Sequence, residues 1–565
     1  MRYRLQLFAT GILAFGLLSC EHKPPNSPSN QPLQVLPDIA QRAKQLPKTV
    51  IDYDRTLLNE KDQALVAKLI EVSHIIDDVY LSQVSEENPA LLNKLTSLAV
   101  NPQYKPALDY FMVMKGRWDR LALQEPFIAP FGDAGKKPEG AGFYPADMTK
   151  AEFEKWIADH PSDKEAFESL YTVIRRKDNG LVAIPYSTQY HERLLPASLK
   201  LKEAAMMTGN RSLYEYLNHL GTSILKDDYY ASDLAWMDLN SPIEVVIGPE
   251  EVYEDRLFNY KASFEAFVTV ADKAESEKLM VYASHLPDME KNLPEPEEYK
   301  NPNRGTSSPI RVVQEIFTGG DARRGVQNAA FNLPNDEKVR EAKGSKKVLL
   351  KNVIEAKYNT AAVPIAKRVM APEIVSQLSF NSFFDQILFH ELSHGLGPGI
   401  INGPDGKKQD ARIYLKEIYS TIEECKADVL GIWNILYAID HHLITTYDDK
   451  TLYTTYMGTL FRGMRFGIDE AHGRGCAIQW NWLREKGAIA EAPGGHFTIV
   501  YEKSLEGYKS LATELLTIEA TGDYNRANAL ANKYGVETPE MVAVTKSLSD
   551  IPVDINPVFA GAGEK

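Results

Sequence analysis

The chain has 565 residues, which is too long for one small module, so we expect two or three domains or one large two-lobed body. Hydrophobic residues make up 44% of the chain and charged residues 25%, which excludes collagen-like and mainly disordered proteins. The 77 acidic residues outnumber the 63 lysines and arginines, the net charge is −14, and no basic run offsets it. Nucleic acid is therefore not an expected partner. Three cysteines are too few for a disulfide framework.

The first 20 residues have the pattern of a bacterial export signal. Two arginines precede an apolar run, which ends in Leu-Leu-Ser-Cys and is too short to span a membrane. This ending resembles a lipoprotein box, in which the cysteine, here Cys20, becomes the acylated first residue of the mature chain. Residues 1–19 are then a signal peptide and residues 20–48 a proline-containing tether. We expect a lipid-anchored protein of the cell envelope, either periplasmic or on the cell surface; the alternative is a plain secretory signal.

Helical patterns dominate both ends of the remaining chain, and strand patterns occur in its middle. Apolar residues spaced three and four apart predict a helix over residues 57–83 and mainly helical structure from 49 to 235. Runs of β-branched residues predict strands at 244–248 and 310–314. Helical patterns return from about 370 to 486. The sequence therefore predicts an α+β protein.

The strongest local signal is a His-Glu-x-x-His motif at residues 390–394. The preceding residues, 381–389, have one apolar face, which predicts that the motif lies on a helix. His390 and His394 are then one turn apart and separated by about 40° around the axis, so both imidazoles can bind one zinc ion. Glu391 lies beside them, where it can polarise a zinc-bound water. The motif alone can arise by chance, so a third ligand is needed.

The third ligand is expected in residues 411–440, which lack proline and predict one long buried helix. Its centre carries Glu423, Glu424 and Asp428, and carboxylates in an apolar helix are costly unless they are paired or bind a cation. Glu424 and Asp428 are one turn apart, so one of them can bind the metal while the other accepts the second N–H group of a ligand histidine, and Glu423 can do the same for the other histidine. Cys425 is also a possible ligand. We prefer Glu424, because two histidines, one carboxylate and an open position describe a hydrolytic zinc site.

These two motifs resemble those of the dipeptidyl peptidase III family of zinc peptidases, whose hallmarks are HExxGH and a downstream EExxA(E/D). Further segments resemble the same family in the same order: GPEEVYEDR at 248–256, FNLPND at 331–336, KVLLKNVI at 347–354 and Glu-Ala-His at 470–472. This chain departs from the pattern in its shorter HExxH, which suits a regular helix and should still bind zinc. The departure leaves open the preferred peptide length and the rate.

The resemblance implies a role for each residue at a matching position. One zinc ion would be bound by His390, His394 and Glu424. Glu391 would be the general base that takes a proton from the zinc-bound water. Two residues would donate hydrogen bonds to the tetrahedral intermediate, Tyr253 and His472. Three would hold the free amino group and the first amides of the peptide, which limits cleavage to dipeptides: Glu251, Asn332 and Asn335.

The resemblance also implies an α+β fold of two lobes, with a mainly helical zinc lobe, a mixed lobe built on a β-barrel core, and a wide substrate cleft between them. We expect the mixed lobe to comprise residues 49–270 and 307–345, and the zinc lobe residues 271–306 and 346–495. The lobe of residues 496–565 is left open.

We therefore expect a monomeric zinc-dependent exopeptidase that releases dipeptides from the N-terminus of short peptides. One alternative is another HExxH zinc peptidase, either an aminopeptidase or an endopeptidase. A second alternative is a surface lipoprotein that binds nutrients without catalysis, which would hold no zinc.

Overall fold

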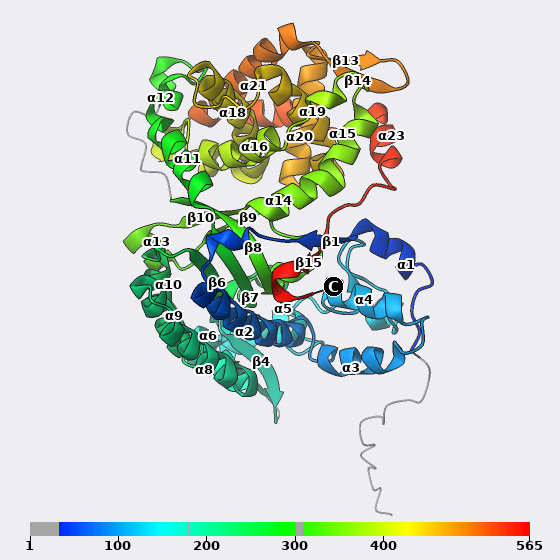
Figure 1. The fold of residues 1–565 in the computed structure, drawn as a ribbon, viewed down its shortest axis with the longest axis vertical. Coiled ribbons are helices and arrows are strands. Elements are labelled where there is room, and N and C mark those ends of the chain that lie inside the picture. Colours follow the sequence, from blue (N-terminus) through cyan, green and yellow to red (C-terminus); the bar gives the residue numbers. More distant parts are fainter. Residues whose placement is uncertain (1–32, 179, 301–308, 565) are drawn as a thin grey trace, which may run out of the picture.

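The computed structural model describes residues 33–178, 180–300 and 309–564. The expected signal peptide, Cys20 and the first part of the tether lie outside the described residues. In this part of the chain, no helix combines the length and the apolar composition that crossing a membrane would require. Figure 1 shows that most helices after residue 350 gather at one end of the molecule and that the N-terminal helices surround a sheet at the other, where the last strand of the chain (red) also lies.

The central feature is a five-stranded sheet with the order β6-β7-β8-β10-β9. Its strands, in chain order, are β6 (Ile243–Glu251), β7 (Ser263–Ala271), β8 (Ile310–Gly320), β9 (Ala330–Leu333) and β10 (Lys346–Leu350). Strands β8 and β10 pair in parallel, and the other neighbours are antiparallel. The strands predicted at 244–248 and 310–314 are therefore confirmed as β6 and the start of β8.

The predicted β-barrel core is wrong, because this sheet stays open between its edge strands. The sheet curls so far that Lys346 Nζ on β10 lies 3.0 Å from Glu244 Oε1 on β6. A barrel closes only when its edge strands form a hydrogen-bonded ladder. Among the described strands, β9 has four residues and pairs with β10 alone. Side-chain contacts therefore bridge the gap that a ladder would fill in a barrel.

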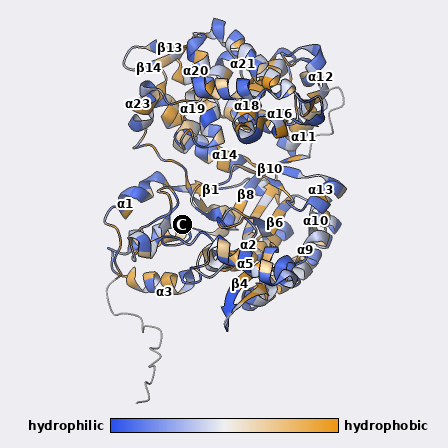
Figure 2. Cartoon of the chain, turned by 180° about the vertical axis from the view of Figure 1, so that it is seen from behind, coloured by the Kyte–Doolittle hydropathy of each residue, from blue (hydrophilic) through white to orange (hydrophobic). Residues whose placement is uncertain are grey.

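Two large hydrophobic clusters lie on the two faces of the sheet. The first, which we call the sheet cluster, contains Val348 and Leu350 of β10 together with residues of β6 and β7. The second, the helical cluster, contains Leu349 of β10 together with the helices of the C-terminal half. Successive side chains of a strand point to opposite faces, so β10 contributes to both clusters. Figure 2 shows hydrophobic and hydrophilic segments alternating along the outer helices, as expected when one face is buried.

The helices fall into two groups along the chain. The N-terminal group comprises α1 (Ile39–Arg42), α2 (Glu60–Val84), α3 (Asn88–Leu98), α4 (Lys105–Met114), α5 (Lys150–Asp159), α6 (Lys164–Glu168), α7 (Tyr186–Gln189), α8 (His191–Met207), α9 (Arg211–Ser223) and α10 (Tyr230–Met237). The later group comprises α11 (Lys273–Ser284), α12 (Leu286–Lys291), α13 (Glu337–Lys343), α14 (Lys351–Lys357), α15 (Val363–Val369), α16 (Phe380–Ser393), α17 (Ala411–Leu415), α18 (Tyr419–Asp440), α19 (Asp449–Met464), α20 (Ala471–Glu485), α21 (Tyr501–Thr521), α22 (Tyr524–Tyr534) and α23 (Pro539–Ser547).

Short two-stranded sheets complete the fold. They pair β1 (Lys48–Ile51) with β15 (Asn556–Phe559), β2 (Trp118–Asp119) with β3 (Glu125–Pro126), β4 (Thr172–Lys177) with β5 (Gly180–Pro185), β11 (Ile400–Asn402) with β12 (Lys408–Asp410), and β13 (Ile489–Ala492) with β14 (His496–Ile499). The pairing of β1 with β15 is parallel and joins segments from near both ends of the described chain.

The helix predicted over 57–83 is confirmed as α2, which begins after Asn59, whose side chain caps the first turn. The single helix predicted over 411–440 is wrong. The chain forms α17, then a short 3₁₀ turn, then α18. Lys416 adopts a positive φ of 54°, outside the helical region, and this ends α17. The interruption lies one turn before α18 and leaves Glu423, Glu424 and Asp428 together on one helix.

Candidate metal centre

Two packed helices, α16 and α18, carry the metal motifs. The Ser379 side chain caps α16 by accepting a hydrogen bond from the backbone N–H of Ser382. His390 and Glu391 lie in the last turn, and His394 follows as the C-cap residue. Gly431 lets α18 approach closely, because a Cβ atom at that position would lie 3.2 Å from the backbone nitrogen of His390. The two helices can therefore bring their polar side chains to one point.

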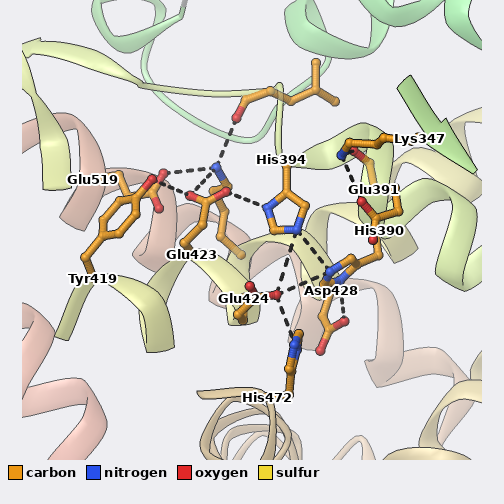
Figure 3. A network of polar contacts seen from close by, with 12 residues as sticks. Lys347, His390, Glu391, His394, Tyr419, Glu423, Glu424, Asp428, His472 and Glu519 are labelled. Carbon is orange, nitrogen blue, oxygen red and sulfur yellow. Dashed lines mark hydrogen bonds and ion pairs between the residues drawn. The ribbon is translucent and has the colours of Figure 1, made fainter. Parts of the chain in front are cut away.

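Three ligand atoms converge at that point, and Figure 3 shows them facing one another. The Nε2 atoms of His390 and His394 are 3.1 Å apart. Glu424 Oε2 lies 3.3 Å from His390 Nε2 and 3.8 Å from His394 Nε2. The ligand atoms of these three residues all lie within 4.8 Å of one another. The structure thus brings together the three residues that the sequence predicts as metal ligands.

A carboxylate lies behind each histidine. His390 Nδ1 is 2.8 Å from Asp428 Oδ1, and His394 Nδ1 is 2.8 Å from Glu423 Oε1. An ionised carboxylate only accepts hydrogen bonds, so each Nδ1 atom must carry the proton. The Nε2 atom of each ring then faces the same point, where it can bind a metal ion. The structure therefore places Glu423 and Asp428 behind the ligand histidines, as the sequence predicts.

The converging lone pairs form a site that fits a cation. Two imidazole nitrogens and a carboxylate oxygen repel one another at these distances unless positive charge lies between them. Among the described residues, no donor forms a well-aligned hydrogen bond to the buried Glu424 Oε2. Two nitrogens and one oxygen, with each histidine oriented by a carboxylate, match the ligand set of catalytic zinc sites.

The electrostatics of the chain favour positive charge at the same point. Burial opposes the charged form of His390, but its interactions with Asp428 and Glu424 outweigh burial and raise its pKa to about 10. Burial also works to raise the pKa of Glu424, but its contacts with His390 and His472 hold that pKa below its ordinary value. A proton and a metal ion therefore compete for the same place.

Glu391 lies beside the ligands and faces a lysine from the sheet. Lys347 Nζ on β10 donates to Glu391 Oε2 at 2.8 Å and to the backbone oxygen of Glu391 at 3.0 Å. Burial works to raise the pKa of Glu391, but Lys347 and His390 hold that pKa below its ordinary value. The carboxylate that the sequence predicts as the base is therefore ionised.

His472 reaches the same site from a third helix. It is the second residue of α20, and its Nδ1 lies 3.3 Å from Glu424 Oε2. Its side chain is 55% exposed, so it lies at the open side of the metal site. The structure therefore brings His472 to the metal ligands, as the sequence predicts.

The other predicted residues gather where the curled edges of the sheet approach each other. Asn335, just after β9, donates from Nδ2 to the backbone oxygen of Glu250 on β6 at 3.0 Å. Burial raises the pKa of Glu251, the last residue of β6, above its ordinary value, although hydrogen bonds from Asn335 and Tyr253 work against it. The Tyr253 side chain is 66% exposed. These residues form a second polar group.

One strand pair connects the second polar group to the metal site. Asn332 on β9 is exposed and lies directly opposite Lys347 on β10. Opposed residues of antiparallel strands have their Cβ atoms about 5 Å apart on one face. Asn332 is therefore a neighbour of the lysine that binds Glu391.

Solved structures closely resemble this chain. A structure described as DPP III from Caldithrix abyssi is 48% identical, covers 92% of this chain and 98% of its own, and superposes with a TM-score of 0.88. The chain belongs to the dipeptidyl peptidase III family. A dipeptidyl-peptidase III structure from Corallococcus sp. strain EGB is 38% identical, covers 94% and 98% of the two chains, and has a TM-score of 0.76. Residues 147–412 match the family model Peptidase family M49.

Curated sequences match different shares of this chain. Dipeptidyl peptidase 3 of Homo sapiens is 27% identical over 228 residues, which are 36% of this chain and 30% of the human protein. A longer match, 35% identical over 553 residues, is to Nudix hydrolase 3 of Arabidopsis thaliana, and it covers 89% of this chain and 71% of the plant protein.

Three residues around this dipeptidyl peptidase III site are not predicted from the sequence. Lys426 Nζ lies 2.9 Å from Glu423 Oε2, and Gln479 Nε2 donates to Asp428 Oδ2 at 3.0 Å. Lys347 is the third. A lysine three residues after Glu423 in a buried helix is a signal for Lys426, and two adjacent lysines in an apolar strand are a signal for Lys347. Gln479 lies far away in the sequence and gives no such signal.

Proposed function

We propose that this member of the dipeptidyl peptidase III family is a zinc-dependent exopeptidase that releases dipeptides from the N-terminus of short peptides. The observation that carries the proposal is the convergence of His390 Nε2, His394 Nε2 and Glu424 Oε2. These residues would hold one zinc ion. When bound, zinc supplies a Lewis acid that polarises a carbonyl group and lowers the pKa of water.

The chain's own residues would supply the proton transfers and the orientation. Glu391 would accept a proton from the attacking water at its carboxylate and pass it to the leaving amine. Its ionised state supports this role. His472 and Tyr253 would donate hydrogen bonds to the oxygen on which negative charge develops. Asp428 and Glu423 would keep the ligand histidines oriented.

The second polar group would bind the free end of the peptide. Glu251 would pair with the α-ammonium group, and Asn332 and Asn335 would bind the first backbone amides. An ammonium group satisfies a partly buried carboxylate that already accepts hydrogen bonds from Asn335 and Tyr253. Binding the ammonium group at a fixed distance from the metal would limit the product to dipeptides.

We also infer that the enzyme has two lobes with a substrate cleft between them. Most members of the two hydrophobic clusters fall within a mixed lobe of residues 49–270 and 307–345 or a zinc lobe of 271–306 and 346–495, which supports this division, although β10 contributes to both clusters. Most buried residues of 496–551 belong to the helical cluster, which favours assigning this segment to the zinc lobe. A monomer attached to the cell envelope through Cys20, and short peptides as substrates, complete the proposal.

The role of Glu391 is tested by replacing it with alanine. Glu391→Ala should keep zinc but lose at least about 1,000-fold in kcat, because the base is lost while the ligands remain. Glu355→Ala, at an exposed position of α14, is the matched control and should keep full activity. Zinc content and hydrolysis rates are measured on both. Full hydrolysis by Glu391→Ala would refute the proposed mechanism.

A further inference from the structure

Lys347 links the β9–β10 strand pair to Glu391, the proposed general base near the C-terminal end of α16. It lies on β10, and its side chain follows the face of Leu349, which belongs to the helical cluster. Its neighbour Lys346 points to the other face, where it is buried against Glu244 and over the ring of Trp236. Two adjacent lysines therefore serve opposite sides of the sheet.

Lys347 makes two hydrogen bonds to one residue, Glu391. Its Nζ binds both the side-chain Oε2 and the backbone oxygen of Glu391. Because Lys347 binds both the backbone oxygen and the carboxylate of Glu391, it restricts the rotamers that the Glu391 side chain can adopt. The side chains of Lys347 and Glu391 are only 17% and 25% exposed, so water competes weakly for these bonds.

The strand pairing places Lys347 beside Asn332, three residues before Asn335 of the second polar group. Lys347 lies opposite Asn332 in the β9–β10 ladder. The backbone ladder holds both residues at a fixed separation. The same strand pair therefore positions a peptide bound along Asn332 and, through Lys347, the carboxylate of Glu391.

We propose that Lys347 is a positioning residue that sets the Glu391 carboxylate relative to the bound peptide. The inference rests on the proposed function, because it assigns a role to Lys347 within that reaction. A misplacement of the base by about 1 Å can cost on the order of 100-fold in rate without weakening the binding of substrate. Lys347 therefore acts on kcat and leaves KM and the zinc ligands unchanged.

The test compares three variants of the full chain with the unaltered enzyme. Lys347→Met should lower kcat by about 10- to 100-fold, with KM within about threefold and one zinc per chain. Lys347→Arg, which keeps a cation that can bind both oxygens, should recover part of the lost kcat. Lys351→Met is the matched control: this lysine begins α14 and pairs with Glu275 at 2.9 Å, away from Glu391. It should keep the full kcat.

The outcomes separate this inference from the proposed function. If the unaltered protein releases no dipeptides, the proposed function fails before any variant is compared. If it does, a kcat of Lys347→Met within twofold of the unaltered enzyme overturns the inference. The same follows if Lys351→Met loses as much, if Lys347→Arg is as slow as Lys347→Met, or if the loss is accompanied by loss of zinc.

Discussion

Each ligand histidine of the metal centre is held by a carboxylate, and each carboxylate is held by a further donor. Gln479 Nε2 binds the second oxygen of Asp428, and Lys426 Nζ binds the second oxygen of Glu423. Lys426 is itself buried and also lies 3.3 Å from Glu519. Because both oxygens of each carboxylate are engaged, an imidazole cannot turn without breaking a hydrogen bond. The ligand geometry is thus prepared by the protein.

Replacing Asp428 tests this preparation. Asp428→Ala should weaken zinc binding by about 10- to 100-fold, because His390 loses the acceptor that fixes its tautomer. Competition with a chelator measures the affinity. Asp440→Ala, at an exposed position on the same helix, is the control. An unchanged zinc affinity in Asp428→Ala would show that the carboxylate does not orient the ligand.

Local spacing explains which site residues can be predicted from the sequence. His390 and His394 are one helical turn apart, as are Glu424 and Asp428, so their common faces follow from helix geometry alone. Gln479 and Lys347 come from α20 and β10, and their approach to the site depends on how these elements pack. The periodicity of a single segment does not show which distant elements pack against it.

At the scale of elements, the close packing of α16 on α18 sets the distances at the metal site. Gly431 lies where α18 comes within contact distance of the His390 backbone. A helix interior usually disfavours glycine by about 1 kcal/mol relative to alanine. Glycine at this position therefore lowers helix stability but allows α18 to pack closely against α16. The break at Lys416 shows the converse: an uninterrupted apolar pattern predicted one helix, but the positive φ of Lys416 interrupts the helix shortly before α18 begins.

Adding one methyl group at the contact should disturb the metal site. Gly431→Ala should weaken zinc binding by about 10-fold, because its Cβ atom pushes α18 and Glu424 away from His390. Gly458→Ala is the matched control, since its Cβ atom would lie 3.0 Å from Ala366 Cβ in a contact between α19 and α15. The control should lower the melting temperature and keep zinc affinity. Equal zinc affinities in the two variants would contradict this account.

At the scale of the whole molecule, the C-terminal segment ties the two clusters together. In this segment, buried apolar residues as far as Ile551 belong to the helical cluster, whereas Ile555 and Phe559 belong to the sheet cluster. Between them, Asp554 forms a buried ion pair with Lys357 of α14 at 2.7 Å. The α+β class could be predicted from helical and strand patterns, but the open sheet could not, because closure depends on whether distant edge strands pair.

Removing one member of this buried pair should destabilise the protein strongly. Asp554→Ala should lower the free energy of unfolding by about 3–5 kcal/mol, because Lys357 is left buried without its counterion. Asp550→Ala removes an exposed pair with Arg368 and should cost less than about 1 kcal/mol. Denaturant unfolding of both variants provides the comparison. Similar costs for the two would mean that Asp554 does not act as a buried tie.

Mass analysis of the products from an unblocked hexapeptide tests dipeptide release itself. The zinc-loaded protein should produce the N-terminal dipeptide and a tetrapeptide first, and the same peptide with an acetylated N-terminus should stay intact, because Glu251 would lack its ammonium partner. Removal of zinc should stop cleavage, and its return should restore it. Release of single residues, internal cuts, or cleavage of the acetylated peptide would contradict the proposed function.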